Sequence, residues 1–147
     1  MKIMGIDYGD ARTGVAISDL LCSIVGSTAV VPSRNREKLM ADILRLIQDN
    51  GVGEVVVGLP KNMDGTEGAR AELCRAFADE LKERCGLPVA MWDERRTTVD
   101  AHRILGAQGV RAKNRKDKID SVAATLILEG FLDWKRLQAQ RQKEEQA

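Results

Sequence analysis

The segment Glu54-Val55-Val56-Val57-Gly58 constrains the fold of this chain more than any other. Its three consecutive β-branched residues form a continuous apolar run rather than an alternating one, which is typical of a strand buried on both faces of a sheet. A strand of this kind needs helices on both sides of its sheet to cover it. The segment therefore predicts a layered α/β domain.

The order of the other expected elements predicts a mixed sheet. Strands are expected at 2–7, 14–18, 23–31, 54–58 and 88–93, and helices at 37–48, 68–84, 97–108 and from about 117 to beyond 134. The first three strands follow one another through short turns and form an antiparallel meander. The last two strands belong to β-α crossover units and are expected to be parallel. We predict a mixed five-stranded sheet flanked by helices on both faces.

Length and composition indicate one globular domain. Among 147 residues, we expect residues 1–137 to form it and the polar segment 138–147 to fray or stay disordered. No apolar stretch approaches the roughly 20 residues of a membrane span, and the N-terminus does not have the pattern of a signal peptide. Three cysteines without a C-x-x-C pair indicate reduced thiols in a cytoplasmic protein rather than a zinc site.

One of the expected helices, 68–84, has a periodic apolar pattern. Its residues at helical spacing are Leu73, Ala76, Phe77, Glu80 and Leu81. Residues three and four apart lie on one side of a helix, so this set predicts the face that packs on the sheet.

Acidic residues end two of the expected strands. Asp7 follows an apolar run and, by strand alternation, shares a face with Ile3 and Gly5. The last strand ends in the pair Asp93-Glu94. A carboxylate at the end of a buried strand costs free energy unless a partner or a metal compensates it. These positions are therefore candidates for a shared site.

A third acid, Asp120, lies in the last expected helix. Ala123, Ala124 and Ile127 stand three, four and seven residues after it, which puts Asp120 at the margin of the apolar stripe. Hydrolysis of a phosphodiester needs an activated water and stabilisation of charge on the leaving oxygen. Two hard cations such as Mg²⁺, roughly 3.5–4 Å apart and held by clustered carboxylates, supply both. Three convergent acids would supply that site.

Each acid also has an ordinary structural explanation. Asp7 would cap the turn that follows it, and the acids at 93 and 94 would pair with the two arginines that come next. Asp120 would be a surface acid stabilised by the helix dipole. The spacing alone neither proves that the three acids meet nor chooses between Asp93 and Glu94.

A basic segment, residues 111–118, precedes Asp120 and reads Arg-Ala-Lys-Asn-Arg-Lys-Asp-Lys, although the net charge of the whole chain is only +1. Basic side chains at the start of a helix oppose its dipole but suit the binding of phosphate. Lys113, Arg115, Lys116 and Lys118 are therefore candidate contacts to nucleic acid. Because aromatic residues make up only 3% of the chain, contacts to the phosphate backbone are favoured over base stacking on an aromatic platform.

Four segments together resemble the YqgF family, also named RuvX. They are Gly-Ile-Asp-Tyr-Gly-x-x-Arg-Thr-Gly-Val-Ala at 5–16, Val-Gly-Leu-Pro-x-Asn-Met-Asp-Gly-Thr at 57–66, Asp-Glu-Arg-x-Thr-Thr at 93–98 and Asp-Ser-Val-Ala-Ala at 120–124. They occur in the family's order and extend the match to about Asp133. The resemblance implies a ribonuclease H-like fold and a nuclease that uses a divalent metal.

The resemblance also assigns roles to individual residues. Asp7, Glu94 and Asp120 match the family's active-site acids and would be the catalytic ligands of Mg²⁺ or Mn²⁺, with Asp93 as the second choice for the middle position. Arg95 would contact the nucleic acid close to the reaction. A departure from the pattern is the arginine at 96, where relatives more often carry an apolar residue or serine.

The activity that the resemblance implies is processing of the 5′ end of pre-16S ribosomal RNA in the cytoplasm. Resolution of four-way DNA junctions uses the same chemistry and stays open as an alternative, as does a non-catalytic adaptor that binds nucleic acid with the same fold. A nucleotide-binding fold of the actin and sugar-kinase type would need two such domains, and this chain supplies one. We expect no membrane contact and a monomer or weak homodimer.

Overall fold

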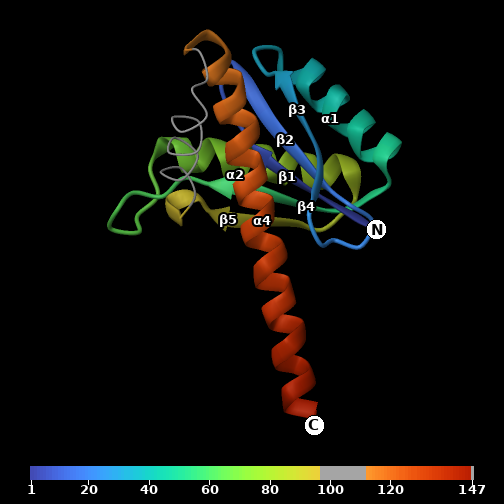
Figure 1. The fold of residues 1–147 in the computed structure, drawn as a ribbon. Coiled ribbons are helices and arrows are strands. Elements are labelled where there is room, and N and C mark those ends of the chain that lie inside the picture. The colour runs from blue at the N-terminus through green and yellow to red at the C-terminus, as the bar shows by residue number, and fades with distance from the viewer. Residues whose placement is uncertain (97–111, 147) are drawn as a thin grey trace.

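The computed structural model describes the backbone of residues 1–96 and 112–146 and the side chains of 1–95 and 121–146 (Figure 1). Its strands are β1 (Lys2–Asp7), β2 (Arg12–Ser18), β3 (Val25–Pro32), β4 (Val52–Leu59) and β5 (Val89–Asp93). Its helices are α1 (Arg36–Asn50), α2 (Ala69–Cys85) and α4 (Ala112–Gln146), with a 3₁₀ turn η1 at Glu94–Arg96. The five strands lie where the sequence predicts them, and the helix expected at 97–108 lies outside the described residues.

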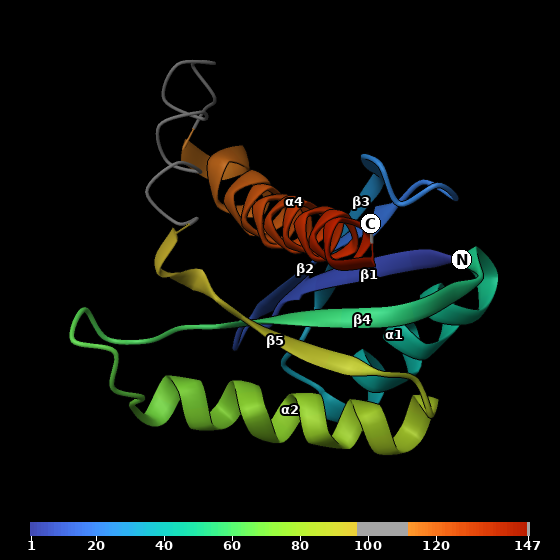
Figure 2. The same ribbon diagram turned by 90° about the horizontal axis from the view of Figure 1, so that it is seen from below.

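The strands form one mixed sheet in the order β3-β2-β1-β4-β5. The pairs β1–β2 and β2–β3 are antiparallel, and the pairs β1–β4 and β4–β5 are parallel. Helix α4 covers one face of this sheet, and α1 and α2 cover the other (Figure 2). The mixed sheet with helices on both faces confirms the predicted fold class. Because β1, β4 and β5 are parallel, their carboxyl ends lie side by side at one end of the strands. We call this end of the sheet the carboxyl edge.

Strand β1 contributes to two hydrophobic cores, one on each face of the sheet. Met4 and Ile6 are fully buried in the core beneath α1 and α2, together with Phe77 of α2. Ile3 faces the other way and packs in the core beneath α4 with Leu128. The predicted alternation along β1 is therefore confirmed.

Helix α2 packs on the sheet through a face that differs from the predicted one. Phe77 and Leu81 are buried as expected, but Leu73 is 47% exposed and Ala76 is also exposed. The buried face is completed by smaller residues, Ala71, Cys74 and Ala78. The sequence pattern favours the large Leu73, whereas a helix lying close to a sheet accommodates small side chains on its inner face.

Helix α4 is longer than predicted at both ends. It starts at Ala112 rather than near residue 117 and continues to Gln146, through the segment expected to fray. Its C-terminal part extends beyond the sheet (Figure 1). None of the helices in the described ranges is long and apolar enough to cross a membrane.

Three of the chain's aromatic rings lie together between β5 and α4. The ring of Phe131 lies 6.4 Å from that of Trp92 in an edge-to-face arrangement and 5.8 Å from that of Trp134 in a stacked one. Trp92 belongs to β5, and the other two belong to α4. This aromatic cluster holds the middle of α4 against β5, the outermost strand on that side of the sheet.

Helix α4 lies directly against β1 at Gly5. A β-carbon added at Gly5 would lie 2.8 Å from Cβ of Leu128 and 3.1 Å from the carbonyl oxygen of Ala124. Both neighbours belong to the rigid body of the helix, so they have little freedom to move aside. The absence of a side chain at Gly5 therefore allows α4 to dock directly on the central strand.

We predict that Gly5→Ala lowers the free energy of unfolding by about 1–3 kcal/mol, the usual range for forcing extra atoms into a packed core. Urea denaturation of the purified variant measures the change. The matched control is Gly26→Ala in β3, where the nearest atoms to an added β-carbon lie at 3.6 Å and leave it ordinary contact distances. Equal effects of the two substitutions would contradict the close docking of α4 on Gly5.

Candidate active site

Two of the predicted acids meet at the carboxyl edge. Asp7 is the last residue of β1, and Glu94 comes directly after β5, with β4 between these two strands. Their side chains are hydrogen-bonded to each other. Gly58 of β4 leaves room for this contact, because a β-carbon there would lie 2.6 Å from Oε1 of Glu94. Glu94 therefore reaches toward Asp7 over a glycine in the intervening strand.

Both carboxyl groups are partly buried, and the pKa of each is raised above its ordinary value. Burial first, and then the negative charge of Glu94, raise the pKa of Asp7 to about 8. Burial also raises the pKa of Glu94, although the hydrogen bond from Asp7 opposes that rise. Without a metal, the pair therefore keeps a proton at neutral pH, which allows one carboxyl group to donate a hydrogen bond to the other.

Asp93 has a different environment from Glu94, although the two are adjacent. Its carboxylate forms an ion pair with Arg95 at 2.6 Å and also accepts a hydrogen bond from the Arg95 backbone N–H at 3.0 Å. These contacts hold the pKa of Asp93 below its ordinary value. Asp93 thus pairs with a neighbouring arginine, which was the ordinary structural explanation for both acids. Glu94 instead turns toward Asp7.

Arg70, in the first turn of α2, supplies a positive charge near the acid pair. Its guanidinium donates to the carbonyl oxygen of Tyr8 and, at 2.9 Å, to Oδ1 of Asp10. The same charge lowers the pKa of both Asp7 and Glu94, against the larger effect of burial. Sequence reasoning missed Arg70, although a basic residue opening a helix is the signal that drew attention to residues 111–118.

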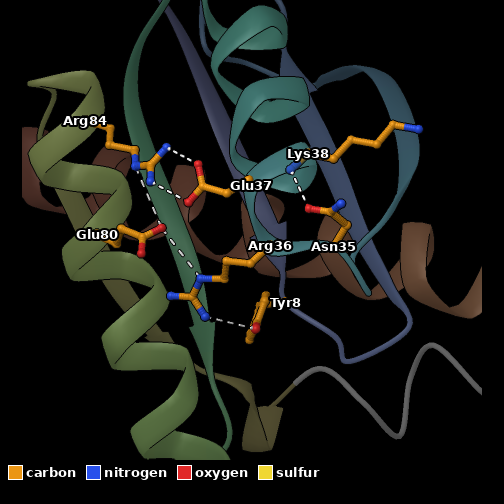
Figure 3. Close-up of polar contacts among 7 residues, drawn as sticks. All are labelled: Tyr8, Asn35, Arg36, Glu37, Lys38, Glu80 and Arg84. Carbon is orange, nitrogen blue, oxygen red and sulfur yellow. Dashed lines mark hydrogen bonds and ion pairs between the residues drawn. The ribbon is translucent and has the colours of Figure 1, made fainter.

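Tyr8, which follows Asp7, is held in place by α1 and α2, the helices on the face of the sheet opposite α4. Its ring stacks on Phe77 with a centroid distance of 4.5 Å, and Arg36 of α1 donates to its hydroxyl oxygen at 3.3 Å. Arg36 in turn pairs with Glu80 of α2 at 3.5 Å (Figure 3). This network fixes the backbone immediately after Asp7.

Figure 3 also shows how the start of α1 and the end of α2 are joined. Arg84 of α2 pairs with Glu37 of α1 at 3.0 Å. Asn35 caps α1 by accepting a hydrogen bond from the backbone N–H of Lys38 at 3.1 Å. The two helices that contact Tyr8 are therefore also joined to each other by an ion pair.

The turn after Asp7 is held by other side chains. Thr13 accepts a hydrogen bond from the backbone N–H of Gly9 at 3.3 Å, and Ser33 donates to the Gly9 carbonyl oxygen at 2.7 Å. The sequence left open that Asp7 caps this turn. The contacts of Thr13 and Ser33 hold the turn, and the carboxyl group of Asp7 contacts Glu94.

The remaining predicted site residues belong to the first part of α4. Asp120, Lys113, Arg115, Lys116 and Lys118 are in the helix by their backbone, and their side chains lie outside what the structure describes. Ala123, Ala124 and Ile127, three, four and seven residues after Asp120, are buried. A β-carbon at Gly58 would lie 2.6 Å from Cδ1 of Ile127 as well as from Glu94, so α4 passes beside the acid pair.

The acid pair fits a divalent cation by its chemistry. Carboxylate oxygens are the ligands that Mg²⁺ and Mn²⁺ prefer, so Asp7 and Glu94 would hold such a cation once they had lost their proton. Among the side chains that the structure describes, no group of three His, Cys, Asp or Glu residues is arranged to hold a metal. Asp120, whose side chain lies outside the described residues, is the third ligand that the sequence predicts.

Comparison with known proteins gives the family. A family model described as "RuvX: Holliday junction resolvase" matches residues 1–134. The chain belongs to the RuvX family. A relative from Halothermothrix orenii is 47% identical over 134 residues, which cover 91% of this chain and 96% of the relative. Another from Lachnospira eligens is 44% identical over 92% of this chain and 99% of the relative, and both are named "Putative pre-16S rRNA nuclease".

Solved structures of resolvases share the fold of this RuvX protein. Thermus thermophilus RuvC, in complex with a Holliday junction substrate, matches with a TM-score of 0.56 at 14% identity, covering 92% of this chain and 96% of that one. The fowlpox virus Holliday junction resolvase also gives a TM-score of 0.56, at 12% identity, covering 90% and 99%. These likenesses confirm the predicted ribonuclease H-like fold.

The raised pKa of Asp7 predicts how stability depends on pH in the metal-free protein. The folded state keeps the Asp7 proton up to about pH 8, while the unfolded state releases it near 3.8, so stability falls as pH rises between these values. Asp7→Asn removes this dependence and should stabilise the metal-free protein at pH 8.5 by on the order of a few kcal/mol, but much less at pH 5. Thermal unfolding with a chelator present at both pH values measures the difference.

The control for this prediction is Asp93→Asn. The pKa of Asp93 is lowered by Arg95, so its contribution to stability is present above the unfolded pKa and is lost as pH falls. Asp93→Asn should therefore give no gain at pH 8.5. An equal effect of Asp7→Asn at both pH values would argue against a buried, proton-sharing pair.

Proposed function

We propose that this RuvX protein is a divalent-metal-dependent nuclease that processes the 5′ end of pre-16S ribosomal RNA. The observation that carries the proposal is the contact between Asp7, at the end of β1, and Glu94, directly after β5, in a partly buried position at the carboxyl edge. The relatives that are 44% and 47% identical, both named "Putative pre-16S rRNA nuclease", support the same activity.

In the proposed reaction, Asp7, Glu94 and Asp120 hold Mg²⁺ or Mn²⁺. When bound, the metal supplies an activated water and stabilises charge on the leaving oxygen. The carboxylates fix the position of the site at the end of β1, and Arg70 offsets part of their negative charge. Arg95, next to Glu94 in the chain, contacts the nucleic acid near the scissile phosphate.

The substrate proposal rests on the names of the relatives, and junction resolution is the second candidate. Resolution is favoured by the description of the family model and by the fold shared with RuvC. A cleavage assay that compares a pre-16S ribosomal RNA fragment with a four-way DNA junction, each with Mg²⁺ or Mn²⁺, separates the two. We also propose a cytoplasmic location, in keeping with three cysteines that are all free thiols.

Replacement of either acid of the pair should abolish metal-dependent cleavage. Asp7→Asn and Glu94→Gln remove a charged metal ligand while keeping the size and hydrogen-bonding capacity of the side chain, so the fold should be retained. We expect a loss of at least about 10²-fold in kcat, the scale seen when a preorganised electrostatic group is removed. Asp93→Asn is the control, since Asp93 pairs with Arg95, and its activity should stay within a few-fold of the parent.

Undiminished cleavage by Asp7→Asn would refute the assignment of the site. Equal losses in Glu94→Gln and Asp93→Asn would instead mean that the substitutions disturb the end of β5 as a whole. Circular dichroism and thermal unfolding of each variant show which of these applies.

Charge reversal in the basic segment should weaken binding and reduce its salt dependence. Lys113→Glu together with Lys116→Glu removes two cations that would neutralise phosphates, so the slope of log K against log salt concentration should become shallower by about 1–2 units. Fluorescence anisotropy with labelled RNA over a range of salt concentrations measures the slope. An unchanged slope would mean that this segment does not contact phosphates.

A further inference from the structure

The loop of residues 60–68, which we call the Met63 loop, joins β4 to α2. It begins where β4 ends at Leu59, so it leaves the sheet at the carboxyl edge, between β1, which ends in Asp7, and β5, which is followed by Glu94. In Figure 2 this green loop extends beyond the end of the sheet. The proposed nuclease reaction gives it no role, although its sequence is one of the four family-like segments.

Hydrogen bonds within the Met63 loop fix its shape. The backbone N–H of Asn62 donates to the carbonyl oxygen of Thr66 at 2.8 Å, and that of Gly65 donates to the carbonyl oxygen of Asn62 at 2.9 Å. The Thr66 hydroxyl donates to Oδ1 of Asp64 at 2.6 Å, and the Thr66 backbone N–H donates to the same oxygen at 2.9 Å. A tip braced in this way presents its remaining side chain in a defined position.

That remaining side chain is Met63, which is 93% exposed. A methionine so placed contributes nothing to the core and leaves nearly all of its apolar surface in water. Its unbranched, polarisable side chain suits apolar surfaces of variable shape, such as the faces of nucleobases. Methionine is among the residues that act as apolar wedges between bases in complexes with nucleic acid.

Charged groups connect the Met63 loop to the acid pair. A β-carbon added at Gly65 would lie 3.6 Å from Nη1 of Arg95, the residue after Glu94. Lys61, at the base of the loop, lowers the pKa of Asp93 through its charge. Lys61 and Arg95, the latter paired with Asp93, thus bring positive charge to the base and the tip of the loop, where they would attract the phosphates on either side of the scissile bond.

We propose that Met63 packs against an unpaired nucleobase next to the scissile phosphate and so sets a preference for substrates with unpaired nucleotides at the cleavage site. The projecting tip reaches the face of a base only where that face is free, because opening a stacked duplex costs free energy. An unpaired base offers its face at lower cost. This inference rests on the proposed nuclease function and names the structure of the substrate that the site takes.

The test compares Met63→Gln with Met63→Leu on two RNA duplexes that differ only in one unpaired nucleotide at the cleavage site. We expect Met63→Gln to lose about tenfold in kcat/KM on the duplex with the unpaired nucleotide, the scale of one apolar side chain no longer buried, and little on the paired duplex. Met63→Leu keeps an apolar tip and should retain the preference. A preference unchanged in Met63→Gln would overturn the proposal.

Leu21→Gln is the matched control for surface polarity. Leu21 is 83% exposed in the turn after β2, at the opposite edge of the sheet, where Ser18 accepts a hydrogen bond from the backbone N–H of Ile3. Its substitution should leave both substrates unaffected. Because Met63 and Leu21 are both largely exposed, all three variants should unfold at the temperature of the parent protein.

A binding measurement separates this proposal from the proposed catalysis. In the Asp7→Asn background, fluorescence anisotropy compares the affinities for the two duplexes with and without Met63→Gln. Absence of metal-dependent cleavage by the parent protein would refute the catalytic proposal and leave this measurement valid. Loss of preferential binding to the unpaired substrate in Met63→Gln supports the inference, and equal preference with either residue at position 63 overturns it.

Discussion

Holding Asp7 against Glu94 in a partly buried position costs free energy in the metal-free protein, because loss of solvent and mutual repulsion both oppose their negative charge. The surrounding structure maintains this contact. Parallel pairing of β1, β4 and β5 brings the two strand ends to one edge, and Gly58 leaves space over the strand between them. Arg70 offsets part of the charge from α2. A divalent cation would remove most of the cost, so in the proposed enzyme the fold and the metal stabilise each other.

The surroundings of the acid pair differ on the two faces of the sheet. On one face, α4 lies against Gly5 through Ala124 and Leu128 and against Gly58 through Ile127, so the helix that carries Asp120 is held close to the strands. On the other face, aromatic stacking and arginine contacts fix Tyr8 from α1 and α2. The site therefore depends on packing in both cores, and substitutions far from the acids are able to shift its geometry.

The strands and the fold class were predictable because β-branched runs, alternation and turns are local signals in the sequence. Alternation alone did not choose Glu94 over Asp93, since the chain enters a 3₁₀ turn at Glu94 and leaves the strand pattern, and the preference for Glu94 came from the family resemblance. Arg70 was missed because its partners, Tyr8 and Asp10, lie about 60 residues away in the chain. The buried face of α2 was predicted wrongly because the sequence pattern gave weight to the large Leu73, whereas the smaller Ala71, Cys74 and Ala78 face the sheet. The part of Asp120 and of the basic segment in the site stays a prediction.

The aromatic cluster has a spectroscopic consequence. Both tryptophans of the chain, Trp92 and Trp134, lie along α4, and one of them contacts it from the edge strand β5. The chain's single tyrosine, Tyr8, lies in the other core, directly beside Asp7. Intrinsic tryptophan emission therefore reports on the docking of α4, and tyrosine absorbance reports on the strand end at the acid pair. The two halves of the molecule are thus observable separately without any added label.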